Sequence, residues 1–298
     1  MQTIEPSIPT DRNWKSALID LHIHTSASDG SYSPREIVHL ALEYNIKAIA
    51  ITDHDTIQGN AEGFTEGVQK GIEVIPGVEI SAEWNHHLIH ILGYYIDDRS
   101  TKLASELDAL IRFREERNPK IIEKLNALGL NISYDEVRAA AGLGTIGRPH
   151  FAQVLVAKQY AKNSDEAFKK YLQRGASAYA EKKRLTPLEG VRLIREAGGI
   201  PVLAHPFVTN GISEEEMEGF VVELKCMGIE GIEVLYPTHT VHQTLVLQSI
   251  ARKYNLLETG GSDFHGEQKP DIKLARGFGN MHVPYEVVTR MKERLPGR

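Results

Sequence analysis

Short apolar runs alternate with amphipathic segments along most of the chain, and this alternation constrains the fold more than any other feature of the sequence. Several runs contain β-branched residues and are flanked by Gly or Pro, as buried parallel strands are. Strand–helix alternation is typical of a parallel sheet or a (β/α) barrel, so we predict an α/β fold. The predicted strands cover residues 17–23, 47–52, 73–80, 88–95, 200–204, 231–235 and 256–261, with a further candidate at 277–282.

Capping signals mark where the predicted helices begin. Ser33 is followed by Pro34 and Glu36, which is a capping box with Pro at the first helical position. Thr186 and Glu189 repeat this pattern, with Pro again at the first helical position. The predicted helices cover residues 34–45, 187–197, 213–228, 239–254 and 284–295.

The alternation breaks between residues 103 and 180, where apolar residues recur at helical spacing. We predict an all-helical insertion at 103–180, a small cap beside a barrel that is built from residues 17–102 and 181–298. Residues 1–16 carry two prolines and lack an apolar segment, so we expect an N-terminal arm rather than a signal peptide.

The composition restricts what the protein can bind and where in the cell it is expected. Lys and Arg number 34 against 40 Asp and Glu, a net charge of −6, which argues against stable binding of long DNA or other long nucleic acid. A small anionic substrate is compatible with this balance if metal ions invert the local charge. The single Cys226 excludes a disulfide framework and a thiolate metal cage, so we expect a reducing cytoplasm. We expect no membrane span, because no stretch approaches about 20 apolar residues.

Histidine and carboxylate side chains gather at the ends of the predicted strands, and the chain has thirteen histidines. In the first strand, Asp20, His22 and His24 fall on one face because strand side chains alternate. Two imidazoles at this spacing suit a single ion, and Asp20 is placed to orient a ring from behind. Residues 25–30 then predict a turn that carries Asp29 to the same end.

The later strands end in a similar way. His54 stands between Asp53 and Asp55, and Glu79 and His90 interrupt the apolar runs of the third and fourth strands. The remaining candidates are His205, Asp263 and His265, which follow the fifth and last strands. Each of these residues alone has an ordinary alternative: a core or surface histidine, turn chemistry, or a buried ion pair. Strand ends that meet at one rim of a barrel favour an active site instead.

The types of ligand restrict the metal. Imidazole and carboxylate without thiolate suit Mn, Zn, Fe or Mg. Nine candidate ligands are too many for one ion, so we predict two or three divalent ions that share a bridging carboxylate, with Mn as the expected metal. Three such ions against three carboxylates leave a local charge of about +3, which attracts a phosphate dianion and lowers the pKa of a bridging water.

Together these motifs resemble the polymerase and histidinol phosphatase (PHP) family of metal-dependent phosphoesterases. The matching segments are 20–25, 51–55, 76–79, 204–206 and 262–265, in the family's order. The resemblance implies a distorted seven-stranded (β/α)7 barrel with a trinuclear site. It assigns His22, His24, Glu79 and Asp263 to a first ion, Glu79, His90 and His205 to a second, and Asp29, His54 and His265 to a third.

The resemblance is closer to one branch of the family, the single-domain bacterial branch that includes ribonuclease AM and the 3′,5′-nucleoside bisphosphate phosphatases. Within the insertion, the run Gly147-Arg148-Pro149-His150 is similar to a branch motif whose Arg and His reach the substrate phosphate. A rigid Pro beside Arg and His suits an anion clamp, and the alternative is a surface cation before a helix start.

These features predict a hydrolase in which a metal-bridging hydroxide attacks phosphorus in line. The resemblance implies a 3′,5′-bisphosphonucleotide or the 5′ end of a short RNA as substrate. Two alternatives stay open. A histidinol-phosphate phosphatase is disfavoured by the insertion and by Arg148 and His150, and a non-catalytic module is disfavoured by the complete set of metal motifs.

Two further groups carry open interpretations. Lys182, Lys183 and Arg184 are either a solvated face or a guide for an RNA strand. Trp84 and Tyr94 either pack in the core or stack on a base.

Overall fold

The computed structural model describes residues 17–141, 146–180, 184–208 and 212–295, so the predicted arm at 1–16 lies outside the described residues. The chain divides into two compact units. Met1–Ala104 and Leu185–Arg298 form the barrel unit, and Ser105–Arg184 form the helical unit. None of the described helices is long and apolar enough to cross a membrane.

The barrel unit is built on one mixed sheet of eight strands in the order β7-β6-β5-β4-β3-β2-β1-β8. Its two sides approach each other beyond β1, where the His24 amide donates to the Phe264 carbonyl at 2.9 Å, so the sheet nearly closes into a barrel. The strands are β1 (Leu18–Ile23), β2 (Ala48–Ile51), β3 (Glu73–Trp84), β4 (His87–Tyr94), β5 (Ile200–Leu203), β6 (Gly231–Leu235), β7 (Leu257–Gly260) and β8 (Val283–Pro284).

The strand directions differ from a purely parallel barrel, and the sheet has eight strands rather than seven. β4 runs antiparallel to both β3 and β5, and β8 antiparallel to β1. The reversal at β4 has a local cause, because Asn85 and His86 have φ values of 45° and 70°. Two successive residues with positive φ form the tight turn that joins antiparallel strands, so Trp84 pairs directly with His87.

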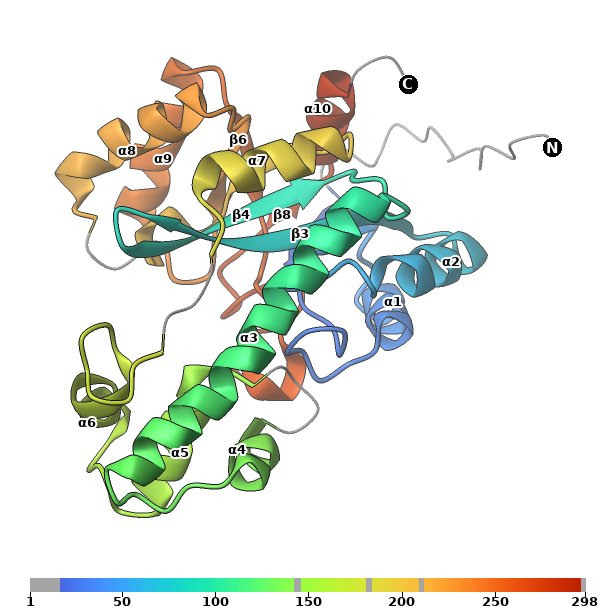
Figure 1. The fold of residues 1–298 in the computed structure, drawn as a ribbon. Helices are drawn as coiled ribbons and strands as arrows, with labels where there is room; N and C mark the ends of the chain where they lie inside the picture. The colour runs from blue at the N-terminus through green and yellow to red at the C-terminus, as the bar shows by residue number, and fades with distance from the viewer. Residues whose placement is uncertain (1–16, 142–145, 181–183, 209–211, 296–298) are drawn as a thin grey trace. The chain divides into compact units, whose positions relative to one another are not determined.

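Helices cover the sheet along most of its length (Figure 1). The capping boxes expected at Ser33 and Thr186 are present, the structure has another at Ser213, and each begins a helix. The helices of the barrel unit are α1 (Pro34–Glu43), α2 (Asn60–Lys70), α7 (Pro187–Glu196), α8 (Glu214–Cys226), α9 (Val241–Lys253) and α10 (Glu286–Arg294).

The strand expected at 277–282 is wrong. Gly277 and Lys273 close a turn through reciprocal backbone hydrogen bonds of 2.8 and 2.9 Å, and the chain pairs with β1 only at Val283 and Pro284. Gly277 and Gly279 have positive φ values, which suit a turn and not a strand. The last helix accordingly begins at Glu286 rather than at residue 284.

Every regular element among the described residues between Ser105 and Arg184 is helical. The hydrophobic centre of this unit includes Ile121, Leu125, Phe151 and Leu155, all fully buried. Its elements are most of α3 (Thr101–Ala127), α4 (Tyr134–Ala141), α5 (Arg148–Ala157), α6 (Ser164–Ala167) and a π-helical turn, η1 (Phe168–Leu172).

Candidate metal centre

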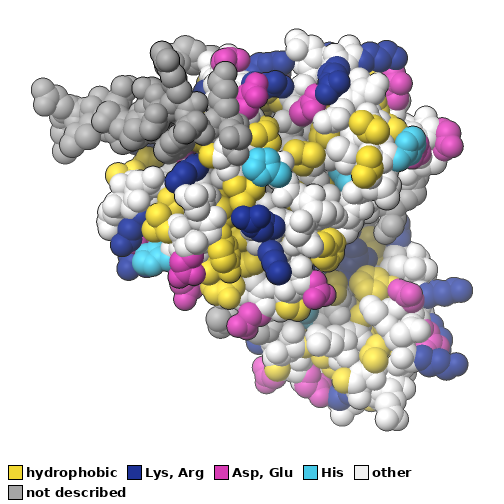
Figure 2. Space-filling view, turned by 180° about the vertical axis from the view of Figure 1, so that it is seen from behind, with side chains coloured by type: hydrophobic (Ala, Val, Ile, Leu, Met, Phe, Trp, Pro, Cys, Tyr) yellow, Lys and Arg dark blue, Asp and Glu magenta, His cyan; other side chains and the backbone are white. Residues whose placement is uncertain are grey.

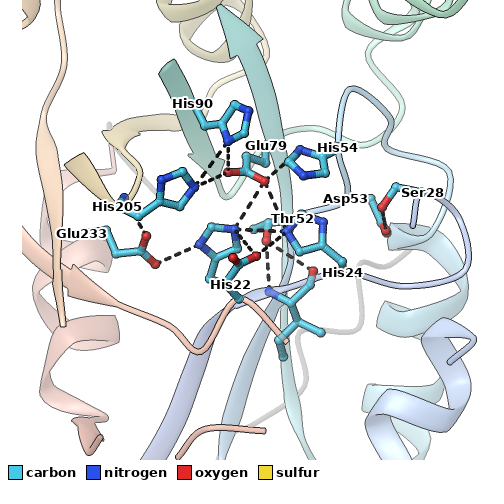
Figure 3. Close-up of polar contacts among 12 residues, drawn as sticks. His22, His24, Ser28, Thr52, Asp53, His54, Glu79, His90, His205 and Glu233 are labelled. Atoms are coloured by element: carbon cyan, nitrogen blue, oxygen red, sulfur yellow. Dashed lines mark hydrogen bonds and ion pairs between the residues drawn. The ribbon is translucent and has the colours of Figure 1, made fainter. Parts of the chain in front are cut away.

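Nine imidazole and carboxylate side chains from different strand ends of the barrel unit lie in one place. Figure 3 shows His22, His24, His54, Glu79, His90 and His205 of this set. They fall into overlapping groups whose potential ligand atoms lie within 4.8 Å of one another. The nine are His22 and His24 at the end of β1, Asp29 in the following turn, His54 after β2, Glu79 in β3, His90 in β4, His205 after β5, and Asp263 and His265 after β7.

Four ligand atoms form the innermost group. Nε2 of His22 and Nε2 of His24 are 3.1 Å apart. Oε2 of Glu79 lies 3.4 Å from the first of these nitrogens and 3.2 Å from the second, and Oδ1 of Asp263 lies 3.6 and 3.2 Å from them. Ligands that sit about 2.0–2.2 Å from one ion are separated by about 3.0–3.5 Å, so each of the two carboxylate oxygens is close to the spacing needed to share an ion with the two imidazole nitrogens.

The second oxygen of Glu79 belongs to another group. Oε1 lies 2.9 Å from Nδ1 of His90 and 3.0 Å from Nε2 of His205, and these two nitrogens are 3.3 Å apart. Glu79 therefore presents one oxygen to each of two neighbouring groups, which is the arrangement of a bridging carboxylate.

A third group lies around Asp29. Oδ1 of Asp29 is 3.5 Å from Nδ1 of His24 and 3.5 Å from Nε2 of His265, and Oδ2 is 4.0 Å from Nε2 of His54. The Asp29 side chain is 45% exposed, whereas His22, His24 and Glu79 are fully buried. The centre therefore opens to solvent on the side of Asp29.

Several buried polar atoms of the centre have no hydrogen-bond partner in the protein. Nδ1 of His24, Nδ1 of His54 and Oε2 of Glu79 are buried and have no hydrogen-bond partner, although three imidazole nitrogens lie within 3.4 Å of the Glu79 oxygen. Buried polar atoms are normally paired, and imidazole–carboxylate sets suit divalent ions. The residues present thus fit multiple divalent metal ions.

The protonation states reflect the same crowding. Burial lowers the pKa of His24, but the carboxylates of Asp263 and Glu79 outweigh it and raise that pKa to about 10. Burial raises the pKa of Glu79, but the imidazoles of His54, His90 and His22 hold it well below its usual range. The carboxylates therefore stay ionised, and protons occupy inner imidazoles until cations replace them.

Three further aspartates fix the loops that carry the centre. Asp53 accepts hydrogen bonds from the Thr25 amide and hydroxyl, both at 2.7 Å, and from the Ser28 hydroxyl at 2.6 Å. Asp55 accepts from the Ser81 amide at 2.8 Å. These bonds tie the turn after β1 to the end of β2, and the end of β2 to β3.

Asp20 does not orient an imidazole ring as expected. Its carboxylate accepts from the backbone amides of His22, Ser262 and Ala275, at 3.2, 2.9 and 2.6 Å, and from the Ser262 hydroxyl at 2.5 Å. It therefore joins β1 to the segment that carries Asp263. The ring of His22 contacts Glu233 instead, with Nδ1 at 2.9 Å from the carboxylate.

Sequence reasoning missed three contributors. Glu233, in β6, is fully buried and lies 2.9 Å from Nδ1 of His22. Tyr236 and Lys269 each donate to Oδ2 of Asp263 at 2.7 Å. An acid inside an apolar strand was the available signal for Glu233, the same signal that identified Glu79. Tyr236 and Lys269 carried no comparable signal.

Arg148 and His150 begin α5 of the helical unit. Arg148 donates to the Leu172 carbonyl at 3.0 Å, and its guanidinium lies 5.7 Å from the centre of the Tyr179 ring. Nδ1 of His150 accepts from the Gly147 amide at 3.0 Å, which places the proton of the neutral ring on Nε2.

The structure also bears on whether Trp84 and Tyr94 stack on a base. Tyr94 is fully buried in the barrel core, so it does not stack on a base. The ring centres of Trp84 and Phe220 are 4.7 Å apart, and Nε1 of Trp84 donates to Glu223 at 2.9 Å. These contacts favour a packing role for Trp84 over stacking on a base. Lys182 and Lys183 lie outside the described residues.

Comparison with known proteins decides the family. A model of the PHP domain matches residues 20–184, more than half of the chain. The chain belongs to the PHP domain family. The family expected from the motifs is thus confirmed, and the strands that carry the nine side chains are those of a PHP fold.

Curated PHP-domain relatives cover nearly the same length. The chain is 36% identical to a 5′-3′ exoribonuclease of Haemophilus influenzae over 83% of this chain and 89% of the relative. It is 32% identical to a 3′,5′-nucleoside bisphosphate phosphatase of Chromobacterium violaceum over 86% and 90%. A solved structure from Bifidobacterium adolescentis, described as a metal-dependent phosphoesterase, superposes with a TM-score of 0.76 at 28% identity, over 95% of this chain and 98% of that one.

Proposed function

We propose that this PHP-domain protein is a metal-dependent hydrolase of nucleotide phosphate esters. It acts as a 3′-phosphatase on 3′,5′-nucleoside bisphosphates, as a 5′–3′ exoribonuclease on short RNA, or as both. The observation that carries this proposal is the position of Glu79, whose two oxygens face two groups of imidazoles within 3.4 Å. Relatives named for both activities support the choice of substrate.

The proposed ligand sets are those that the resemblance to the PHP family implies. The first ion takes His22, His24, Glu79 and Asp263, the second takes Glu79, His90 and His205, and the third takes Asp29, His54 and His265. Mn is the proposed metal, with Zn, Fe or Mg as alternatives. When bound, such ions lower the pKa of a water and offset the negative charge of a phosphoryl group.

Residues around the centre position the proposed ligands and leave a side open to the substrate. Glu233, Asp20 and Asp53 hold the imidazoles and loops in place, so the centre is preorganised. A phosphate ester enters beside Asp29, because the Asp29 side chain is exposed whereas His22 and Glu79 are fully buried. A phosphoryl group that approaches there meets an inner pocket lined by imidazoles.

Arg148 and His150 are the proposed contacts of the substrate phosphate, in an insertion proposed to span 103–180. The Arg148 side chain is ordered by the Leu172 carbonyl and by Tyr179, and Nε2 of His150 carries a proton that can be donated. Guanidinium and imidazole N–H groups are suited to phosphate oxygens. The proposed domain boundaries remain those predicted from the sequence.

The proposed substrates are small and the proposed compartment is a reducing cytoplasm. On the face shown in Figure 2, cationic and acidic side chains are interspersed rather than segregated. Binding to long duplex DNA needs a clustered basic surface, because affinity comes largely from counterion release.

A single activity panel tests the proposal. The substrates are 3′,5′-bisphosphonucleotides, 5′-phosphorylated oligoribonucleotides, mononucleotides and histidinol phosphate, each with Mn²⁺ and with Mg²⁺. We expect the first two classes to be hydrolysed fastest, and we expect the Asp263→Ala variant to be folded and inactive. Preference for histidinol phosphate favours the alternative phosphatase. Absence of turnover and of bound metal favours a non-catalytic module.

A further inference from the structure

The two oxygens of Asp263 have different surroundings. Oδ1 faces the inner group, 3.2 Å from Nε2 of His24 and 3.6 Å from Nε2 of His22. Oδ2 accepts two hydrogen bonds of 2.7 Å, one from the hydroxyl of Tyr236 and one from Nζ of Lys269. One oxygen is therefore committed to protein donors and the other is left for the pocket.

The backbone around Asp263 does not by itself set this orientation. Asp263 has φ of 55°, in the left-handed region that non-glycine residues rarely adopt. It follows β7 in a segment that Asp20 holds through Ser262. This places the Asp263 backbone, but the carboxylate can still rotate between one-oxygen and two-oxygen presentation unless something binds Oδ2.

Tyr236 is well placed to provide that restraint. It immediately follows β6, the strand that carries Glu233, and its ring centre lies 5.2 Å from those of His205 and His239. Its hydroxyl donates to Oδ2 of Asp263 at 2.7 Å. Lys269 reaches the same oxygen from the segment after β7, and its side chain is 42% exposed.

We propose that Tyr236 and Lys269 are positioning residues that hold Asp263 so that only Oδ1 faces the metal pocket. The proposal rests on the proposed metal centre. Outer hydrogen bonds to a ligating carboxylate fix its orientation, and their loss typically weakens metal binding about 10–100-fold. Tyr236 also touches His205, so it links the proposed ligands of two different ions.

The barrel unit contains a matched set of groups away from the nine candidate ligands. Glu73, at the start of β3, accepts from the Tyr285 hydroxyl at 2.5 Å and from Nζ of Lys292 at 3.0 Å. A tyrosine and a lysine thus contact one carboxylate here as well, away from the metal centre. Removal of the Tyr285 hydroxyl therefore controls for the general loss of a tyrosine–carboxylate hydrogen bond.

The experiment measures Mn²⁺ binding to the chelator-treated protein by isothermal titration calorimetry, with circular dichroism as a check on folding. The variants are Tyr236→Phe, Lys269→Met, Lys269→Gln and the control Tyr285→Phe. We expect Tyr236→Phe to weaken Mn²⁺ binding about 10–100-fold and Lys269→Met about tenfold. We expect Lys269→Gln, which keeps a donor without a charge, to recover part of the loss, and Tyr285→Phe to bind as the unaltered protein does.

A second readout separates positioning from a merely structural role. The Mn²⁺ concentration for half-maximal turnover should rise in Tyr236→Phe, while kcat at saturating Mn²⁺ stays near that of the unaltered protein. Wild-type affinity in Tyr236→Phe, or an equal loss in Tyr285→Phe, overturns the proposal. Tighter binding in both Lys269 variants shows that Lys269 acts by charge repulsion and overturns its assignment. If the unaltered protein binds no Mn²⁺, the proposed function itself fails.

Discussion

Nδ1 of His22 lies 2.9 Å from Oε1 of Glu233, although the two residues are 211 positions apart in the sequence. The other oxygen of Glu233 accepts from the backbone amide of His205 at 2.8 Å. When Nδ1–H of His22 is donated to Glu233, the lone pair of Nε2 faces the inner group of the centre. A single acid in β6 therefore sets the tautomer of one candidate ligand and the backbone of another.

Replacing Glu233 should therefore weaken metal binding without removing any candidate ligand. We expect Glu233→Gln to bind Mn²⁺ about 10–100-fold more weakly, because the amide no longer fixes the ring of His22 as an anion does. Calorimetric titration of the chelator-treated protein measures the change. Glu258→Gln is the control, since Glu258, in β7, makes an ion pair with the exposed Arg252 instead of with a candidate ligand. Equal affinities in the two variants would contradict the role given to Glu233.

Glu79 should have the largest effect on activity of the carboxylates in the centre. We expect Glu79→Gln to lose two metal ions together and to reduce kcat by more than about a hundredfold, because both of its oxygens face imidazole groups. Elemental analysis gives the metal content, and phosphate release gives the rate. Glu66→Gln provides the control, because Glu66 is also buried and lies 2.8 Å from His39. A full metal complement in Glu79→Gln would refute the bridging arrangement.

Metal binding should be coupled to proton release. The pKa of His24 is raised to about 10 in the folded metal-free protein, so its imidazole is protonated at neutral pH and must lose a proton to bind an ion. We expect Mn²⁺ affinity to rise between about pH 6 and pH 9. Titrations in buffers with different heats of ionisation count the protons released. If Mn²⁺ affinity did not change with pH and no protons were released, competition between protons and Mn²⁺ for His24 would be ruled out.

The same shift fixes the sign of a stability change. The folded pKa of His24 lies above its ordinary value of 6.5, so its contribution to stability is complete below about pH 6.5. That contribution is lost as the pH rises through about 10. We expect the metal-free protein to melt at a lower temperature at pH 10 than at pH 7, and the difference to shrink in His24→Gln. Differential scanning calorimetry measures both.

Arg148 should affect substrate binding rather than metal binding. Hydrogen bonds to charged groups contribute about 1.5–3 kcal/mol, so we expect Arg148→Met to raise KM for a bisphosphonucleotide about 10–100-fold with unchanged Mn²⁺ affinity. Arg148→Lys should recover only part of this, because it cannot bind two oxygens at once. Arg138→Met, which removes a cation beside Tyr134 in the same unit, is the control. A fall in kcat alone would contradict a role in binding.

Much of the barrel and its ligands could be read from local patterns. The capping boxes predicted helix starts, and the alternation of His22 and His24 within an apolar strand predicted a shared face. Asn85 and His86 show where this reasoning stopped, because the positive φ values of a tight turn reverse β4 and no periodicity signals them. Residues 277–282 were predicted as a strand, whereas Gly277 and Gly279 adopt the positive φ values of a turn.

The supports of the centre were harder to predict than its ligands. Ligands are recognised by residue type and by their place at a strand end. Tyr236 and Lys269 lie 27 and 6 positions from Asp263 in the sequence, and both contact its carboxylate. The sequence around Tyr236 or Lys269 does not indicate that Asp263 is the partner. Asp20 was predicted to orient an imidazole ring, but it accepts hydrogen bonds from Ser262 and Ala275. These partners are far along the chain, so the local sequence did not indicate them.

All nine candidate ligands lie outside Ser105–Arg184, and the chain passes between the two units only at Ala104–Ser105 and Arg184–Leu185. The residues proposed to choose the substrate therefore occupy one continuous stretch, and those proposed to cleave it occupy the rest. Mutation and recombination can then alter what is cleaved while the machinery for cleavage is inherited intact. A single scaffold arranged in this way can diversify into enzymes with different preferences without having to reinvent its chemistry.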